Sequence, residues 1–128
     1  MGNSKPYFFG EPVTYMVDGK GRFNIPSKHR KILRQMDEGF DELGLYLSVA
    51  DRSHVICFPQ SYITRNTKKY AKKNLNNKDR RSFFSAEYCR IDGQGRVLLP
   101  EKFGGLEKAV CAANGDVLEI WSPEKYKP

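Results

Sequence analysis

Apolar and polar residues alternate along several short stretches of the chain, which is the pattern of half-buried β-strands. In the first half, the alternation predicts strands over 12–18, 22–25, 45–49 and 54–58. In the second half, it predicts strands over 87–91, 96–99, 109–113 and 117–121. Asp, Asn and Gly stand between many of these stretches and favour tight hairpin turns. The pattern therefore predicts short strands that are largely joined as hairpins.

A helical pattern follows the second predicted strand. Ser27 has the side chain of a helix N-cap, so we expect a helix over 28–36. Three apolar residues are spaced to form its inner face, namely Ile32, Leu33 and Met36.

Three further helical segments are expected. A helix over 61–74 follows the fourth strand, whereas the matching place in the second half has room only for a brief helix over 101–106. Ser122 as a cap and Pro123 at the first helical position indicate the start of a last helix.

One ten-residue phrase occurs twice, at 17–26 and again at 91–100. The paired residues that are identical are Asp18 and Asp92, Gly19 and Gly93, Gly21 and Gly95, Arg22 and Arg96, and Pro26 and Pro100. Asp bonds readily to the backbone that follows it and Gly adopts positive φ without strain, so each phrase is expected to form a tight turn. The chain is therefore expected to be an α+β protein made of two tandem β-β-α-β-β units.

A single unit of this kind would leave its hairpin edges unpaired and prone to aggregation. We therefore expect the two units to interlock their hairpins into one closed barrel with pseudo-twofold symmetry. The first unit would span 7–63, a helical connector 64–84, and the second unit 85–128.

Composition narrows the functional classes. No apolar run approaches the roughly 20 residues of a membrane span, and no apolar leader begins the chain, which favours a cytoplasmic protein. Cys57, Cys89 and Cys111 are scattered without metal spacing and are expected to be reduced core thiols. Neither His29 nor His54 has a nearby metal-binding or catalytic partner. These features predict a protein that has no metal site and is not an enzyme.

The positive charge is concentrated in one segment. The net charge is +7, and residues 65–81 carry eight basic residues against the single acid Asp79. A second basic run, over 19–36, has no acid and is followed by Asp37, Glu38, Asp41 and Glu42. Clustered positive charge favours a polyanionic partner, and a solvated helix face is the alternative.

Arg22 and Arg96 repeat in both position and chemistry. Each follows a turn directly, and arginine is a rigid fork that binds phosphate or guanine bidentately. Asp18 and Asp92, four residues earlier, can hold each fork in place. The alternative is a local Asp–Arg pair that only stiffens the loop.

Four other residues are candidates for DNA contact. Lys20 adds charge to the first turn, Gln94 is its neutral counterpart in the second, and Lys28 and Arg30 are candidates for phosphate binding. We expect the first unit to dominate affinity and the second to contribute more to register.

The doubled D-x-x-x-R turn, each followed by an apolar strand and Pro, resembles the MraZ family of bacterial transcriptional regulators. More broadly, it is similar to the SpoVT/AbrB-like swapped-hairpin domains. The resemblance extends over the opening 7–10, the two signatures at 18–30 and 92–100, and the C-terminal stretch 119–126.

This resemblance implies a swapped-hairpin barrel within one chain and a closed ring of copies. It also implies that the arginine turns contact direct repeats in promoter DNA, upstream of the protein's own division and cell-wall genes. The family is cytoplasmic and nucleoid-associated and has no cofactor.

Two departures stand out: His29 occupies a position that is usually aromatic in the family, and the family's final helix is mostly absent. The alternatives are an AbrB-like antitoxin that binds a toxin protein as well as DNA, and an architectural ring that binds DNA without selectivity.

Overall fold

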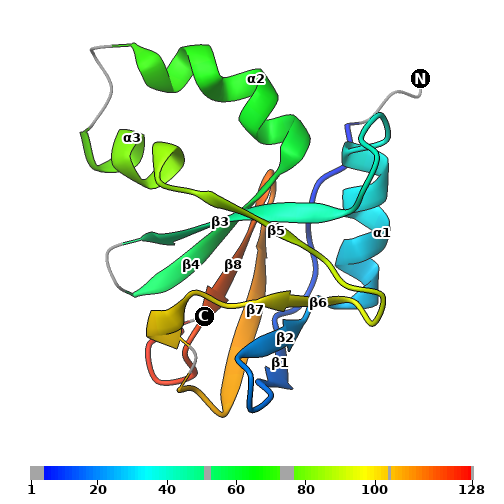
Figure 1. The fold of residues 1–128 in the computed structure, drawn as a ribbon, viewed down its shortest axis with the longest axis vertical. Helices are drawn as coiled ribbons and strands as arrows, with labels where there is room; N and C mark the ends of the chain where they lie inside the picture. The colour runs from blue at the N-terminus through cyan, green and yellow to red at the C-terminus, as the bar shows by residue number, and fades with distance from the viewer. Residues whose placement is uncertain (1–4, 51–52, 73–76, 104, 128) are drawn as a thin grey trace.

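A computed structural model describes residues 5–50, 53–72, 77–103 and 105–127, and it is an α+β fold (Figure 1). The first half contributes β1 (Val13–Met16), β2 (Arg22–Asn24), β3 (Gly44–Ala50) and β4 (His54–Pro59). The second half contributes β5 (Glu87–Arg90), β6 (Arg96–Leu98), β7 (Lys108–Asn114) and β8 (Val117–Trp121). All the strands predicted from alternation are thus confirmed within a residue or two.

The strands form two antiparallel sheets. The larger sheet has the order β1-β7-β8-β4-β3-β5, and the smaller one pairs β2 with β6. Except for the hairpins β3–β4 and β7–β8, every pairing joins a strand of one half to a strand of the other. Exchanging each strand for its counterpart in the other half reverses the order of the large sheet, which is the mark of a pseudo-twofold relation.

One hydrophobic core serves both halves. Phe23, Ile25, Leu45 and Val55 of the first half are almost completely buried in one cluster. Val97, Leu99, Leu118 and Ile120 of the second half belong to the same cluster. The two halves therefore share one dry interior, and neither half has a separate core of its own.

Helix α1 (Ser27–Met36) begins one residue earlier than predicted. The N-cap residue is Pro26, which makes no side-chain cap hydrogen bond, and its extended backbone places Ser27 in the first helical position. The assignment of Ser27 as the N-cap is therefore wrong. The backbone N–H groups of His29 and Arg30 instead donate to the Pro26 carbonyl.

The inner face of α1 contains one residue that the apolar pattern did not include. Leu33 is buried as predicted, and Ile32 and Met36 pack at the edge of the core. His29 is also buried, and its ring meets Phe8 edge-on at 5.6 Å between centroids. A histidine can take an aromatic position here because its ring packs as an aromatic ring does.

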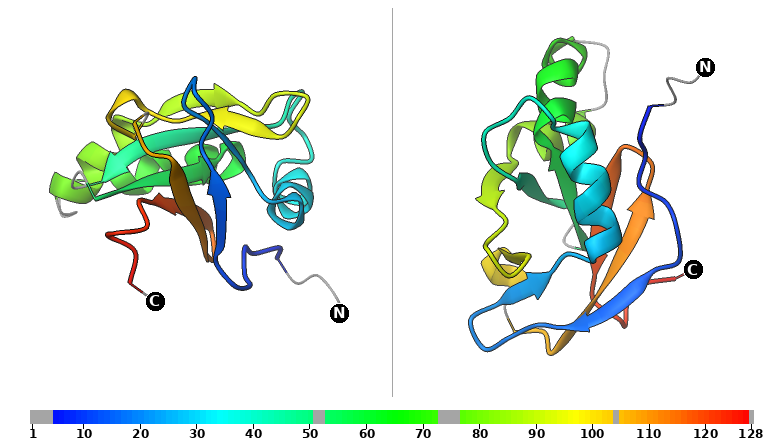
Figure 2. Two further views of the ribbon diagram at one scale, coloured as in Figure 1. Left: turned by 90° about the horizontal axis from the view of Figure 1, so that it is seen from below. Right: turned by 90° about the vertical axis from the view of Figure 1, so that its right-hand side faces the viewer.

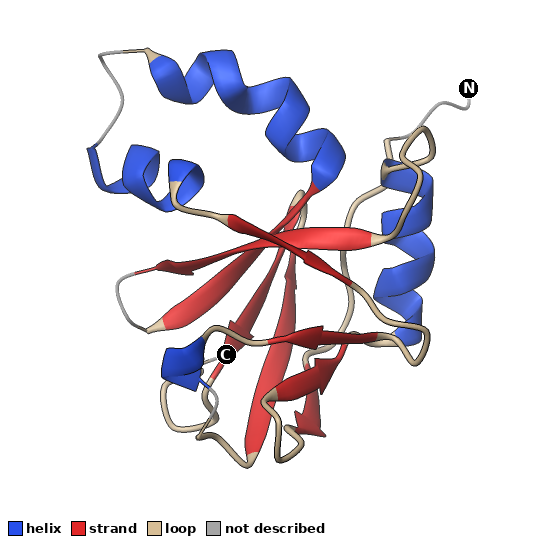
Figure 3. Cartoon of the chain, viewed as in Figure 1, coloured by secondary structure: helices blue, strands red, loops and turns tan. Residues whose placement is uncertain are grey.

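Two helices replace the single helix predicted over 61–74. Helix α2 (Gln60–Ala71) ends earlier than predicted, residues 73–76 lie outside the described part of the chain, and α3 (Asn77–Phe84) follows. Tyr70 and Phe83 stack at 4.2 Å between centroids and hold the two helices together. The α2–α3 pair lies on one side of the molecule and α1 on the other (Figures 2 and 3).

Asp37, the residue after α1, caps the start of α2. Its two carboxylate oxygens accept hydrogen bonds of 2.9 Å from the backbone N–H groups of Gln60 and Ser61. These are among the N–H groups that a helix start leaves without partners. An acid that belongs to an acidic run in the sequence is therefore buried and structural.

The helix after the second repeated phrase is shorter than the helix after the first. The brief helix predicted over 101–106 is confirmed as a single 3-10 turn, η1 (Glu101–Phe103). The helix predicted from Ser122 is wrong for the described residues. Lys125 and Tyr126 both donate to the Ser122 carbonyl at 3.1 Å and close one turn, which falls short of the costly nucleus that a stable helix needs.

Among the described residues, we find no helix with the length and apolar character to cross a membrane.

The buried His29 predicts a pH dependence of stability. Burial, together with the nearby charge of Lys28, lowers the pKa of His29 from 6.5 to about 4. Between these two values the unfolded chain takes up a proton that the folded chain excludes, so the free energy of unfolding should fall as the pH drops from 6.5 to 4. The total loss should approach about 3 kcal/mol.

The variant His29→Phe should lack this loss, because phenylalanine keeps the edge-on contact with Phe8 and takes up no proton. Urea unfolding of both proteins at pH 7 and pH 5 measures the difference. Equal losses of stability in the wild type and the variant would show that His29 does not cause the effect.

Candidate nucleic-acid interface

The first repeated turn is built around Asp18. Its Oδ1 atom accepts hydrogen bonds from the backbone N–H groups of Lys20 and Arg22, at 2.9 and 2.8 Å. The Asp18 carbonyl accepts from the N–H of Gly21, which has a φ of 83°. This left-handed conformation explains why a glycine stands there. Gly19 sits exposed at the tip.

The second turn repeats this geometry. Oδ1 of Asp92 accepts from the N–H groups of Gln94 and Arg96, at 2.9 and 3.0 Å. Gly95 has a φ of 85° and donates its N–H to the Asp92 carbonyl, and Gly93 is the exposed tip. The repeated phrase thus encodes one hydrogen-bonded turn twice.

Each aspartate also holds the arginine that follows its turn. Nε of Arg22 donates to Oδ2 of Asp18 at 2.7 Å, and Nε of Arg96 donates to Oδ2 of Asp92 at 2.9 Å. The arginine side chains are 32% and 22% exposed, so they are partly enclosed and partly open to solvent. The aspartate of each turn therefore holds its guanidinium through the Nε atom.

Pairing of β2 with β6 joins the two turns into one site. Phe23 faces Val97 across this two-stranded ribbon. The carbonyls of Gly21 and Gly95 accept hydrogen bonds of 2.9 Å from Leu99 and Ile25, that is, each from the opposite half. The two arginines, far apart in the sequence, consequently share one surface.

An ion pair across the ribbon confirms this proximity. Nη1 of Arg96 lies 3.7 Å from Oδ2 of Asp18 in the other turn. The backbone and side chain of Arg22, with the Lys20 N–H, lower the pKa of Asp18 from 3.8 to about 2. Hydrogen bonds from the backbone of Arg96 and Gln94 likewise lower the pKa of Asp92. Both carboxylates are therefore charged at neutral pH.

The other candidate residues differ in their surroundings. Lys20 and Gln94 are exposed on the turns. Arg30 is partly buried: its Nε donates to the Ile25 carbonyl at 3.0 Å, and its guanidinium packs against Gly95 of the second turn. Arg30 therefore braces that turn as well as adding charge to it.

Lys28 points elsewhere. Its Nζ donates to the Glu11 carbonyl at 3.0 Å and lies close to Gly10, on the segment that leads into β1. Its contacts are with that segment rather than with the two turns.

The basic segment 65–81 forms a separate surface. Its described members lie on or next to α2 and α3, and Lys73 is outside the described residues. In Figure 1 these helices lie at the top, while the turns between β1 and β2 and between β5 and β6 lie in the lower half. The net charge of the chain and the paired arginines are thus at different places on the molecule.

Two of the three cysteines expected to be core thiols, Cys57 and Cys111, are buried, whereas Cys89 is only partly buried. Cys57, Cys89 and Cys111 are free. Burial raises the pKa of Cys111 to about 12 and that of Cys57 well above its usual 9, so these thiols stay protonated. Within the part of the chain that the structure describes, no group of His, Cys, Asp and Glu side chains is arranged to hold a metal ion.

The second turn allows a test of its geometry. The variant Gly95→Ala should destabilise the protein by about 1–2 kcal/mol, because alanine is strained at positive φ. In addition, a Cβ atom there would lie 2.7 Å from Cζ of Arg30. Gly93→Ala is the matched control, since a Cβ atom on Gly93 meets nothing within 4 Å. Equal melting temperatures for the two variants would contradict this account of the turn.

Comparison with known proteins places this geometry in a family, although no family model matches the chain. The chain is 32% identical to the transcriptional regulator MraZ of Methylococcus capsulatus over 114 residues, which cover 82% of this chain and 72% of the relative. It is 30% identical to the transcriptional regulator MraZ of Corynebacterium jeikeium over 128 residues, covering 93% and 83%. A third relative with the same name, from Rickettsia bellii, is 27% identical over 94% of this chain and 84% of its own length. The chain therefore belongs to the MraZ family.

Proposed function

We propose that this protein is a sequence-specific DNA-binding transcriptional regulator that contacts promoter DNA through Arg22 and Arg96. The observation that carries the proposal is the meeting of the two D-x-x-x-R turns on one ribbon, each with its arginine held by an aspartate. The relatives are named as transcriptional regulators and not as enzymes, which supports it.

The geometry suits recognition by a pre-oriented fork. Each aspartate occupies the Nε of its arginine, so the outer nitrogens of Arg22 are left to donate to a guanine edge or to a phosphate. A side chain that is already fixed loses less conformational entropy on binding. Lys20 and Arg30 add positive charge beside the forks, and Gln94 adds an amide that can bind a base or phosphate.

We further propose that the two sheets close into one swapped-hairpin barrel, built from units 7–63 and 85–128 and joined by the connector 64–84. The hydrogen bonds at the two corners support closure. The backbone N–H of Asp18 donates to the Arg22 carbonyl at 3.0 Å, and the backbone N–H of Asp92 donates to the Arg96 carbonyl at 2.9 Å. These bonds link the edge strands β1 and β5 to the β2–β6 ribbon.

The biological target is proposed from the family resemblance alone. The DNA would consist of direct repeats in the promoter of the protein's own division and cell-wall gene cluster. The protein would act in the cytoplasm, at the nucleoid.

Removal of either arginine fork tests the proposed contact. Arg22→Ala and Arg96→Ala should each weaken binding to a duplex from the region upstream of the gene by about 1–3 kcal/mol, and both should relax selectivity. A gel-shift titration with cognate and random duplexes at fixed salt measures both effects. Arg22→Lys should restore only part of the affinity, because lysine keeps the charge without the fork.

Arg65→Ala, on the exposed face of α2, is the matched control and should leave the preference for the cognate duplex unchanged. Wild-type affinity and selectivity in both turn variants would exclude the arginines from the interface. Equal binding of cognate and random duplexes by the wild type would favour a non-selective architectural protein.

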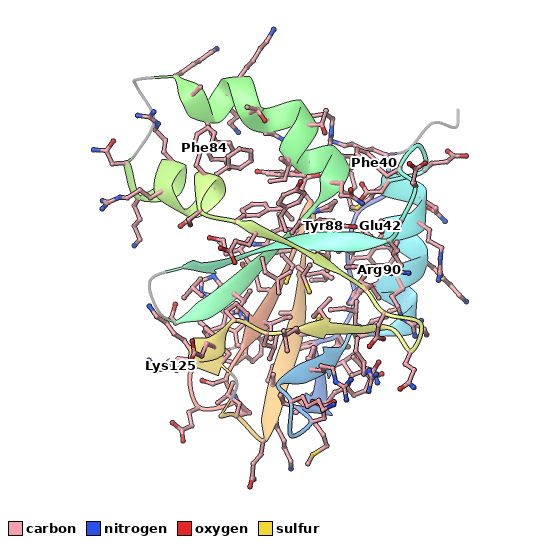
Figure 4. All side chains as sticks on the ribbon, viewed as in Figure 1. Phe40, Glu42, Phe84, Tyr88, Arg90 and Lys125 are labelled. Carbon is pink, nitrogen blue, oxygen red and sulfur yellow. The ribbon has the colours of Figure 1, made fainter. Side chains whose placement is uncertain are left out.

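We also propose that copies of the chain assemble head to tail into a closed ring. Phe84 is 53% exposed beside the bases of α3, and Phe40 is 41% exposed within an acidic loop. The two phenylalanines lie apart in the upper part of the molecule, Phe84 to the left and Phe40 to the right (Figure 4). Two different patches of complementary charge suit a contact that repeats around a ring rather than one that ends in a symmetric dimer.

Near Phe40, the loop is held to the edge of the large sheet. Glu42 accepts a hydrogen bond of 2.7 Å from the Tyr88 hydroxyl, and Arg90 lies 3.9 Å from the same carboxylate (Figure 4). These contacts keep the acidic loop in one position, which favours it as a binding surface.

Disruption of the phenylalanine contact tests the ring. Phe84→Asp should lower the mass of the assembly in solution, because it places a charge in the proposed apolar contact. Light scattering gives the mass, and Met16→Asp is the control because Met16 is 64% exposed on β1, away from both phenylalanines. A monomeric wild type, or a Phe84→Asp variant that keeps the full mass, would contradict this assembly.

A further inference from the structure

The β2–β6 ribbon has an inner and an outer face. Phe23 and Val97 point inward, are buried and pair with each other. The residues on either side of them are more exposed, as the alternation of a strand requires. The outer face therefore carries four side chains, namely Arg22, Asn24, Arg96 and Leu98.

The register gives the two arginines different neighbours. Arg22 lies opposite Leu98, and Arg96 lies opposite Asn24. Asn24 is exposed, and Leu98 is 57% exposed. These two residues occupy equivalent positions in the repeated phrase, yet one is an amide and the other is aliphatic. The pseudo-twofold relation that holds for the arginines thus fails for the residues beside them.

The two turns also differ in the side chains that they place beside the arginines. On one side of the ribbon, Gln94 and Asn24 line one small surface pocket together with Arg30, so two amides gather near Arg96. On the other side, Leu98 accompanies Arg22, whose turn carries Lys20. One half of the site is therefore rich in amides, and the other combines cations with an apolar side chain.

The Leu98 position is also fixed in space. Its backbone N–H donates to Sγ of Cys89 on β5 at 3.4 Å. On its other side, the strand β6 that carries Leu98 is paired with β2. Leu98 is therefore exposed and held in one position on the outer face of the ribbon.

The chemistry of DNA supplies an occupant for this face. The major groove is about 12 Å wide and admits a two-stranded ribbon, whose strands lie about 4.8 Å apart. Asparagine binds the N6 and N7 edge of adenine bidentately, an apolar side chain contacts the methyl group of thymine, and arginine binds guanine. The positive charges of Arg22, Arg96, Lys20 and Arg30 complement the phosphates on either side.

We infer that Asn24 and Leu98 are specificity-determining residues, which read bases from the outer face of the β2–β6 ribbon in the major groove. This inference rests on the proposed function, since it requires that the arginine turns bind DNA. Because the two residues differ, the ribbon reads the two halves of its element differently and binds it in one orientation. Asn24 selects adenine beside the base that Arg96 contacts, and Leu98 selects thymine beside the base that Arg22 contacts.

Selection of bound duplexes from a randomised pool tests the inference. The wild type should enrich a non-palindromic element. Asn24→Ala should lose about 5- to 100-fold of discrimination at one position, and Leu98→Ala should lose the preference for thymine at another. The double swap Asn24→Leu with Leu98→Asn should exchange the adenine and thymine preferences between the two halves. Asn114→Ala, an exposed strand asparagine on β7, is the matched control and should leave every base frequency unchanged.

The outcomes separate the inference from the function on which it rests. If the wild type enriches an element and all three ribbon variants enrich it with the same base frequencies, the inference is wrong and the DNA-binding function stands. If the wild type enriches no element, the proposed function fails and the inference fails with it. Melting curves check the fold, and Asn24→Ser and Leu98→Met provide milder variants that should alter the same positions.

Discussion

Pairing of strands between the two halves is the constraint on which the rest of this structure depends. In each of the pairs β1–β7, β3–β5, β4–β8 and β2–β6, the two hydrogen-bonded strands come from different halves of the chain. A separate half would therefore carry several rows of unpaired backbone groups and an open core. The same pairing brings the two arginine turns together, because the ribbon that bears them takes one strand from each half. The fold and the candidate site therefore depend on the same strand pairings.

Within the candidate site, the two aspartates weaken the attraction for an anion but fix the orientation of the arginines. Asp18 and Asp92 cancel part of the positive charge of the arginines, yet they define where each guanidinium lies. A surface meant only to attract DNA would omit these carboxylates. The net charge of the chain instead resides on α2 and α3, well away from the turns. The excess positive charge and the paired arginines are thus carried by different elements of the protein.

Local signals allowed the strands and turns to be predicted, and tertiary contacts explain what was missed. Alternation and the Asp-Gly pattern act over a few residues, so they are visible in the sequence. Asp37 caps a helix that begins 23 residues later, and His29 is buried because Phe8 covers it. The approach of Arg96 to Asp18 similarly depends on ribbon pairing. In each case the decisive partner lies outside any local window.

The pairing of β1 with β7 has a consequence for folding during synthesis on the ribosome. Val13 on β1 pairs with Cys111 on β7, so β1 leaves the ribosome well before the strand with which it pairs. Contacts between residues so distant in sequence slow folding, because the long intervening loop must close before they form. At about 5–20 residues per second, synthesis of the intervening chain takes roughly 5–20 seconds. During that time the nascent first half exposes strand edges that strands of the second half later cover.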